Sequence, residues 1–262
     1  MNTLTLHDIS YSYGDKKVFR HLSFQVKEGH FVSVVGALCT GKSTLTKIFK
    51  NDVRFSGSYV INGIEIGDSN AYLVDRFVKV VDKDNSIENI LVVDMLFDLF
   101  SRIGVSEKEL SKVVKDYAKE CDISKYLNHY FWDLSKELRY YLMILFNLID
   151  NDKFLVIDNL LGYLRRKQVD NIFKIARVRN MTLINITSRL DELVKCDYAI
   201  FLYDGGIAME GDSLSCLKEE MLLKRLGFNL PFMVDLSIQL NYYGVIDNIY
   251  LDDKEMMDKI WK

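Results

Sequence analysis

The chain has 262 residues, of which 49% are hydrophobic and 27% are charged, as is typical of a packed globular protein. That length suits one large domain with a smaller appendage. A net charge of -3 excludes a general basic surface, so we expect no nucleic-acid partner. The longest strongly apolar run, Tyr140 to Ile149, is about half as long as a membrane-spanning helix.

The N-terminus and the cysteines indicate a protein of the cytosol. Residues 1–6 lack the charged start and the long apolar core of a secretory signal. The cysteines are far apart and form no CxxC pair, so we expect free, reduced thiols at Cys39, Cys121, Cys196 and Cys216.

The first third of the chain is predicted to form strands. Residues alternate in character over Thr3–Ser12 and Lys17–Val26, as in half-buried strands. Phe31–Val35 is a short apolar strand of the kind that is buried in a sheet. Gly57–Ile61 leads into Asn62-Gly63, which is typical of a hairpin turn.

The middle of the chain is predicted to be mainly helical. Ser106 and Glu109 have the spacing of a capping box, and apolar residues then recur at helical spacing. Leu138–Ile149 is predicted to be a buried helix because it is apolar on nearly every side. Phe154–Ile157 follows as a core strand that ends at Asp158.

The last third begins with a core strand over Thr182–Ile186 and a helix from Arg189. A hairpin is predicted from Tyr198–Tyr203 and Ile207–Met209, which flank a glycine-rich turn. Asp212–Gly227 is predicted to be one helix with a capping residue at each end.

We divide the chain into two domains at the end of that helix. Residues 1–227 would form an α/β domain with an N-terminal antiparallel β region and a helical subdomain at about 85–135. Residues 228–262 contain the only proline, Pro231, and would form a small C-terminal domain.

The strongest functional signal is a phosphate loop of the form GxxxxGK[ST] between a predicted strand and a predicted helix. The glycines let backbone N–H groups surround phosphate oxygens, and the start of the helix adds positive charge. Lys42 would reach the β- and γ-phosphates, and Ser43 would bind Mg²⁺. We expect ATP to contact Gly36, Ala37, Leu38, Cys39, Thr40, Gly41, Lys42, Ser43 and the adjacent Thr44.

A Walker B pattern follows at a suitable distance. Phe154–Asp158 consists of four apolar residues and an aspartate at the end of a strand. Asp158 would act on Mg²⁺ together with Ser43, directly or through water.

The order of these motifs resembles that of ABC transporter ATPases over the whole chain. Tyr13 lies 23 residues before Gly36, where the family has an aromatic that stacks on adenine. Leu134-Ser135-Lys136-Glu137-Leu138 occupies the position of the LSGGQ signature, whose serine faces a nucleotide on the partner subunit. Ser56-Gly57 and Leu202–Gly211 also resemble segments of this family.

The C-terminal segment is similar to that of the ATPases of energy-coupling-factor transporters, in Leu226–Leu236 and again in Leu251–Trp261. This resemblance implies dimerisation through the C-terminal domain and a peripheral location on the cytoplasmic side of the membrane. The implied partners are a second ATPase subunit, a membrane-embedded coupling subunit and a substrate-binding membrane subunit. Pairing with a different ATPase fits better, although pairing with itself stays open.

Two positions of the family's hydrolytic machinery are altered. Asn159 stands where the family has the glutamate that polarises water, and an amide cannot accept a proton. Ser188 stands at the position of the switch histidine. We interpret Ser188 as the N-cap of the following helix, together with Asp191.

Four further positions depart from the family pattern. Lys136 and Glu137 replace the signature glycines, and Arg165 replaces the aspartate of the loop after the Walker B strand. The Q-loop glutamine is missing, and the alternatives at its position are Asp82 and Lys83.

These features predict a transporter subunit that binds Mg-ATP and hydrolyses it weakly at its own site. The alternative is a nucleotide-dependent clamp, or regulatory pseudo-ATPase, without turnover.

Overall fold

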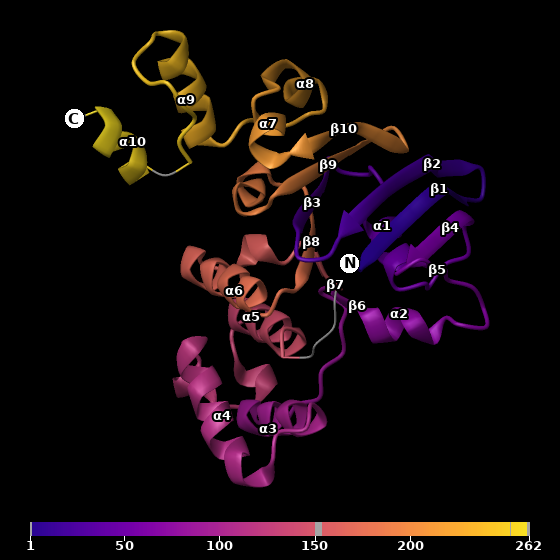
Figure 1. The fold of residues 1–262 in the computed structure, drawn as a ribbon, viewed down its shortest axis with the longest axis vertical. Coiled ribbons are helices and arrows are strands. Elements are labelled where there is room, and N and C mark those ends of the chain that lie inside the picture. The colour runs from indigo at the N-terminus through magenta and orange to yellow at the C-terminus, as the bar shows by residue number, and fades with distance from the viewer. Residues whose placement is uncertain (1, 150–153, 252, 261–262) are drawn as a thin grey trace.

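The computed structural model describes residues 2–149, 154–251 and 253–260 (Figure 1). Its N-terminal part is a four-stranded antiparallel sheet in the order β2-β1-β4-β5. These strands are β1 Thr3–Tyr13, β2 Lys16–Lys27, β4 Ser56–Ile61 and β5 Ile64–Glu65. The predicted strands in this region are confirmed. From Leu22 to Val26, β2 alternates buried with exposed residues, so one face of this sheet packs on the core.

A six-stranded sheet in the order β10-β9-β3-β8-β7-β6 forms the centre of the molecule. All its pairs are parallel except that of β9 and β10. The strands are β3 Phe31–Gly36, β6 Val78–Val81, β7 Phe154–Asp158, β8 Thr182–Thr187, β9 Tyr198–Tyr203 and β10 Gly206–Asp212. β3 is buried along its whole length, as expected of a strand whose sheet is covered on both faces. The predicted α/β fold with an antiparallel N-terminal region is confirmed.

Helix α1 (Lys42–Phe49) fills the space between the two sheets. The apolar residues of α1 are Leu45, Ile48 and Phe49. They share a core with Leu4 of β1, Val34 of β3 and Val156 of β7. A short helix, α2 Tyr72–Phe77, precedes β6. Because both sheets bury α1, its first turn is held at the carboxyl ends of the parallel strands.

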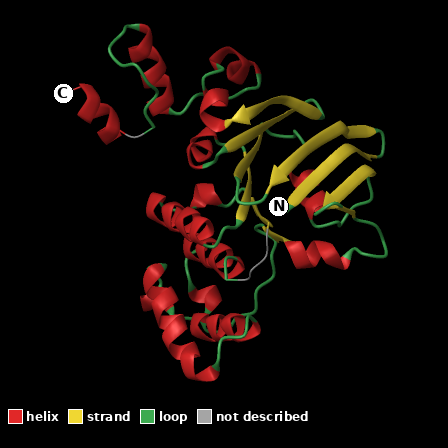
Figure 2. Ribbon diagram, viewed as in Figure 1, coloured by secondary structure: helices red, strands yellow, loops and turns green. Residues whose placement is uncertain are grey.

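A second group of helices, α3 to α6, covers the opposite face of the six-stranded sheet. Figure 2 shows these helices gathered away from the antiparallel strands. They are α3 Val92–Arg102, α4 Glu107–Glu120, α5 Lys136–Asn147 and α6 Arg166–Val178, with 3₁₀-helices at Ser124–Tyr126, Phe131–Asp133 and Leu161–Tyr163. Helix α5 begins and ends two residues earlier than predicted. No helix among the described residues is long and apolar enough to cross a bilayer.

The predicted helix over Asp212–Gly227 is wrong, because two short helices take its place: α7 Ser213–Leu217 and α8 Glu220–Arg225. Asp212 does cap α7, accepting a hydrogen bond from the backbone N–H of Ser215 at 2.9 Å. Gly227 follows α8 at a φ of 84°. Both predicted caps exist, but Glu219 leaves the helical conformation between them, at φ -78° and ψ 57°.

Two predicted side-chain caps are also wrong. Ser188 does not cap a helix: a 3₁₀-helix, η4 Leu190–Lys195, begins after Arg189, whose own side chain makes no capping bond. Ser106 does precede α4, but its Oγ donates to the Glu109 carboxylate at 2.6 Å, so the reciprocal backbone bonds of a capping box do not form.

The C-terminal segment contains α9 Phe232–Tyr242 and α10 Asp253–Ile260, which lie at one end of the molecule (Figure 1). Trp261, the last residue of the predicted similarity, lies outside the described residues. Val234 of α9 shares a core with Phe201 of β9 and Leu193 of η4. The segment is therefore packed on the rest of the chain, and its division from residues 1–227 stays a prediction.

One glycine of the antiparallel sheet is fixed by a close backbone approach, which gives a test of the fold. A Cβ at Gly57 would lie 2.5 Å from the Asp8 carbonyl oxygen, and its φ is 102°. We expect Gly57→Ala to lower the free energy of unfolding by at least about 2 kcal/mol.

The matched control is Gly63→Ala, because Gly63 also has a positive φ but has nothing within 4 Å of an added Cβ. Urea denaturation of the three proteins measures the difference. Equal losses for both variants would contradict the observed approach of β4 to β1.

Candidate functional site

The phosphate loop runs from the end of β3 at Gly36 to the start of α1 at Lys42. Gly41 has a φ of 96°, and a Cβ there would lie 2.8 Å from the Phe19 ring. A Cβ at Gly36 would meet Thr40 Oγ1 at 2.1 Å. The Thr40 hydroxyl itself donates to the Ala37 carbonyl at 3.0 Å. The two glycines are thus required by the tight path of the loop, whose middle residues are turned to solvent.

Lys42 lies inside this loop. Its Nζ donates to the carbonyl oxygens of Gly36 and Ala37, each at 2.6 Å. Burial lowers the pKa of Lys42, and the nearby Asp158 carboxylate opposes that shift. The ammonium group is therefore fixed at the mouth of the loop, where a phosphate group would meet it.

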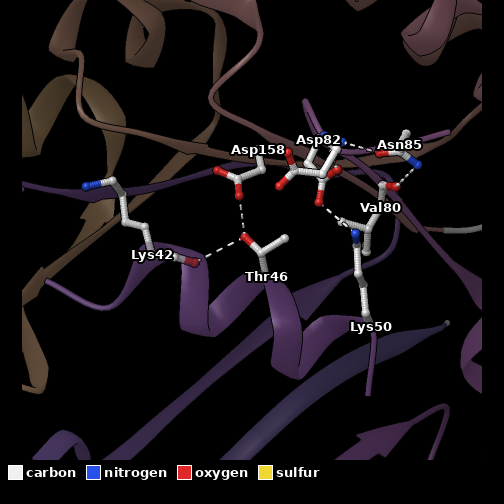
Figure 3. A network of polar contacts seen from close by, with 8 residues as sticks. Lys42, Thr46, Lys50, Val80, Asp82, Asn85 and Asp158 are labelled. Carbon is white, nitrogen blue, oxygen red and sulfur yellow. Dashed lines mark hydrogen bonds and ion pairs between the residues drawn. The ribbon is translucent and has the colours of Figure 1, made fainter. Parts of the chain in front are cut away.

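Asp158 ends β7 and is bound directly to α1. Its Oδ2 accepts a hydrogen bond of 2.7 Å from Thr46 Oγ1, shown in Figure 3. Burial raises the pKa of Asp158, and the negative charge of Asp82 raises it further. No sequence motif indicated Thr46, although its spacing of three residues from Ser43 puts both hydroxyls on one face of the helix. The Ser43 side chain is exposed at the start of α1.

The structure distinguishes between the two candidates for the Q-loop position. Asp82 is only 8% exposed and accepts from Lys50 Nζ at 2.6 Å, whereas Lys83 is exposed. Figure 3 shows the Asp82 side chain beside that of Asp158. Asn85 closes the turn by accepting from the Asp82 backbone N–H at 2.6 Å. No sequence motif indicated Lys50, which is brought to Asp82 by the last turn of α1.

Tyr13 and Thr44 lie together on the other side of α1. A hydrogen bond with the Thr44 side chain lowers the pKa of Tyr13, and Lys47 Nζ donates to its hydroxyl at 3.3 Å. The ammonium group of Lys47 also lies 5.6 Å from the centre of the Tyr13 ring. This ring is about half exposed at the end of β1.

Asn159 and Ser188 directly follow the carboxyl ends of the adjacent strands β7 and β8. Asn159 is exposed, has a φ of 53°, and donates its backbone N–H to the Ile186 carbonyl at 2.8 Å. Ser188 is half-buried just beyond β8. Both residues therefore follow strands at the edge of the six-stranded sheet from which the phosphate loop also starts, and neither residue type can serve as the base that activates water.

Ser135 lies elsewhere, at the start of α5. Its Oγ accepts from the Leu138 backbone N–H at 3.3 Å and caps the helix. The cavity beside it has a volume of about 140 Å³ and is lined by Glu137, Arg165 and other residues, none of them from the phosphate loop. Within the described part of one chain, Ser135 and the phosphate loop belong to separate surfaces.

A larger cavity of about 650 Å³ lies between the loop after β7 and α9, and it contains none of the predicted site residues. Glu192, on its wall, is 8% exposed, and its Oε2 accepts from Asn185 Nδ2 at 2.8 Å. Its Oε1 is buried, forms no hydrogen bond with the residues that the structure describes, and lies 3.8 Å from Arg189 Nε and close to Gly162. This carboxylate links the segment after Ser188 to the loop after β7.

A phosphate loop before α1 and an acidic residue at the end of β7, in a sheet covered on both faces, define a P-loop nucleotide-binding protein. The family model described as ABC transporter matches residues 19–161, more than half of the chain. The chain therefore belongs to the ABC transporter family.

Similar proteins cover nearly the whole chain. The energy-coupling factor transporter ATP-binding protein EcfA1 of Mycoplasmoides gallisepticum is 24% identical over 99% of this chain and 95% of its own length. The protein of the same name from Ligilactobacillus salivarius is 26% identical over 98% and 95%.

Two solved structures share the fold. An ATP-binding subunit of an ABC transporter has a TM-score of 0.71 at 18% identity and covers 91% of this chain and 99% of its own. CbiO1 from Clostridium perfringens, described as part of the ABC transporter complex cbiONQ, has a TM-score of 0.71 at 20% identity over 93% and 98%.

The burial of Glu192 gives a pH-dependent prediction. Burial raises its pKa above the ordinary carboxyl value, so the folded chain holds this proton at pH values where the unfolded chain has lost it. Wild-type stability should therefore fall as pH rises through the window between the two pKa values. We expect Glu192→Gln to remove this part of the pH dependence.

The measurement is the free energy of unfolding in urea at pH 4 and pH 7.5. The free energy of unfolding of Glu192→Gln minus that of wild type should be larger at pH 7.5 than at pH 4. The exposed Glu120→Gln is the control. The same difference in free energy of unfolding between Glu192→Gln and wild type at both pH values would contradict the prediction.

Proposed function

We propose that this chain is the ATP-binding subunit of a membrane transporter of the energy-coupling-factor type, and that it binds Mg-ATP but hydrolyses it weakly at its own site. The single observation that carries this proposal is that Asp158, at the end of β7, is hydrogen-bonded to Thr46 of α1, the helix whose first residue, Lys42, places its ammonium group in the phosphate loop. A phosphate-binding cation and a fixed carboxylate are thus held by the same helix. The names of the relatives supply the transporter type.

The donor set fits a magnesium ion. The Ser43 hydroxyl and the Asp158 carboxylate supply the hard oxygen ligands that Mg²⁺ takes from protein. Asp158, kept partly buried with a raised pKa, gains from a nearby divalent cation. Bound Mg²⁺ would neutralise charge on the phosphates, while Lys42 and the loop N–H groups orient them, and Tyr13 offers its ring to adenine.

Weak hydrolysis follows from the residues beside this proposed Mg-ATP site. Asn159 can orient a water molecule but cannot remove its proton, and Ser188 offers no imidazole. Loss of a general base alone costs about 10²–10⁴ in rate. The alternative, a clamp that closes on ATP without turnover, is favoured by the φ of 53° at Asn159, a conformation that asparagine tolerates better than glutamate does.

The proposed partners follow from surfaces that one chain leaves incomplete. Ser135 is presented away from the phosphate loop, which suits a composite site with a second ATPase subunit. A groove of about 390 Å³ between the Q-loop segment and α3 and α5 is lined by apolar side chains such as Ile87 and Phe146 and by polar ones such as Glu88 and Arg102. This groove suits a membrane-embedded coupling subunit, itself joined to a substrate-binding subunit, with this chain peripheral on the cytoplasmic side.

Lys42→Ala tests nucleotide binding directly. Removal of the ammonium group from the loop should weaken Mg-ATP binding at least about 100-fold, because a buried charge pair with phosphate is lost. Calorimetric titration of the purified chain gives the dissociation constant, with the exposed Lys119→Ala as control. Unchanged affinity in Lys42→Ala would refute the assigned phosphate site.

Asn159→Glu tests the missing base. In the complex that copurifies with the tagged chain, a glutamate there should raise single-turnover hydrolysis about 10–100-fold. Asn159→Gln is the matched control, since it lengthens the side chain without adding a base. A rate that rises equally in both variants would show that the side-chain carboxylate is irrelevant.

A further inference from the structure

Two consecutive residues of the signature segment contact the loop that follows β7. Glu137 Oε1 lies 3.1 Å from Arg165 Nε, and the Glu137 side chain is 29% exposed against 79% for Arg165. Glu137 and Arg165 are both departures from the family pattern. Their pairing means that each departure is matched by the other within the same chain.

The neighbouring Lys136 makes the second contact with this loop. Its Nζ lies 4.8 Å from the centre of the Tyr163 ring and 5.6 Å from that of Tyr140. The two rings pack edge to face at 5.2 Å. The ammonium group is thereby held over aromatic faces beside the N-terminus of α5.

These contacts decide the sign of the charge at the start of α5. The helix N-terminus favours an anion, and Glu137 in its first turn would oppose a second negative group there. Arg165 supplies the compensating charge, so Lys136, Glu137 and Arg165 together carry one net positive charge. A surface of that sign attracts a phosphate group, whereas Lys136 and Glu137 alone are neutral.

We infer that Arg165 is a positioning residue, which neutralises Glu137 and so allows the signature segment to face the triphosphate bound by a second ATPase subunit. This inference rests on the proposed function and adds one claim to it. It does not place Arg165 in contact with the nucleotide. Arg165 acts through Glu137.

The backbone at this position does not depend on the guanidinium group. The Arg165 backbone N–H donates to Gln168 Oε1 at 2.8 Å, which fixes the start of α6. Substitution of the Arg165 side chain therefore changes charge while leaving this bond in place. That separation allows the charge to be tested without loss of the fold.

The experiment is a double-mutant cycle in the complex that copurifies with the affinity-tagged chain. Its readout is the dissociation constant between this chain and the copurifying ATPase, with and without Mg-ATP. Arg165→Gln should weaken the ATP-dependent association about tenfold, because the Glu137 charge then repels phosphate. Glu137→Gln should stay within about twofold of wild type.

The double variant, Arg165→Gln with Glu137→Gln, should recover to within about threefold of wild type, and Arg165→Lys should be affected less than Arg165→Gln. Lys224→Gln, which breaks an exposed ion pair with Glu220 on α8, is the control. A double variant as weak as Arg165→Gln would overturn the inference, since a structural role needs no Glu137.

Different results would contradict the proposed function and the role of Arg165. If wild-type association is the same with and without Mg-ATP, the proposed function fails, and this inference fails with it. If wild type depends on Mg-ATP while Arg165→Gln matches it, the inference alone is wrong.

Discussion

The position of α1 between the two sheets is the constraint on which the candidate site depends. Burial of Leu45, Ile48 and Phe49 fixes the helix between the two sheets, so the polar residues on one side of it face the carboxyl edge of the parallel strands, and those on the other side face Tyr13. Thr46 then bonds to Asp158 on β7, and Lys50 bonds to Asp82 after β6. One helix thus fixes both acidic groups, and a shift of α1 would disturb them together.

The departures from the family pattern are accommodated rather than disruptive. Asn159 occupies a left-handed conformation that suits asparagine, and Asp82 is neutralised by Lys50. Glu137 is paired with Arg165 in the same way. These three altered residues therefore have a local partner or a compatible backbone. The residue types that would accept or relay a proton are replaced at Asn159 and Ser188.

The sequence predicted the strands and the phosphate loop well because their signals are local. An apolar run such as Phe31–Val35 followed by a glycine-rich loop has few structural alternatives. The partners of charged residues were not predictable, since Lys50 meets Asp82 only when α1 and β6 come together in the fold. The single helix expected over Asp212–Gly227 failed because no proline or glycine within it marks the break at Glu219. The cap expected at Ser188 failed because the chain delays its helix until Leu190.

The pairing of Arg165 with Glu137 bears on how a dimer could open under the proposed function. Two bound ATP molecules would each hold the interface closed, and a site with Asn159 in place of the base would keep its nucleotide long after the other had been hydrolysed. Opening of the dimer must then overcome the contacts around the ATP that this site still holds. Under the proposed function the signature segment of this chain faces the nucleotide of the second subunit, so its net positive charge bears on that site and not on the one beside Asn159. The two kinds of departure would therefore act at different sites of the dimer. Asn159 would slow the chemistry at this chain's own phosphate loop, while Glu137 and Arg165 would set the contact with the partner's nucleotide, and opening would depend on both.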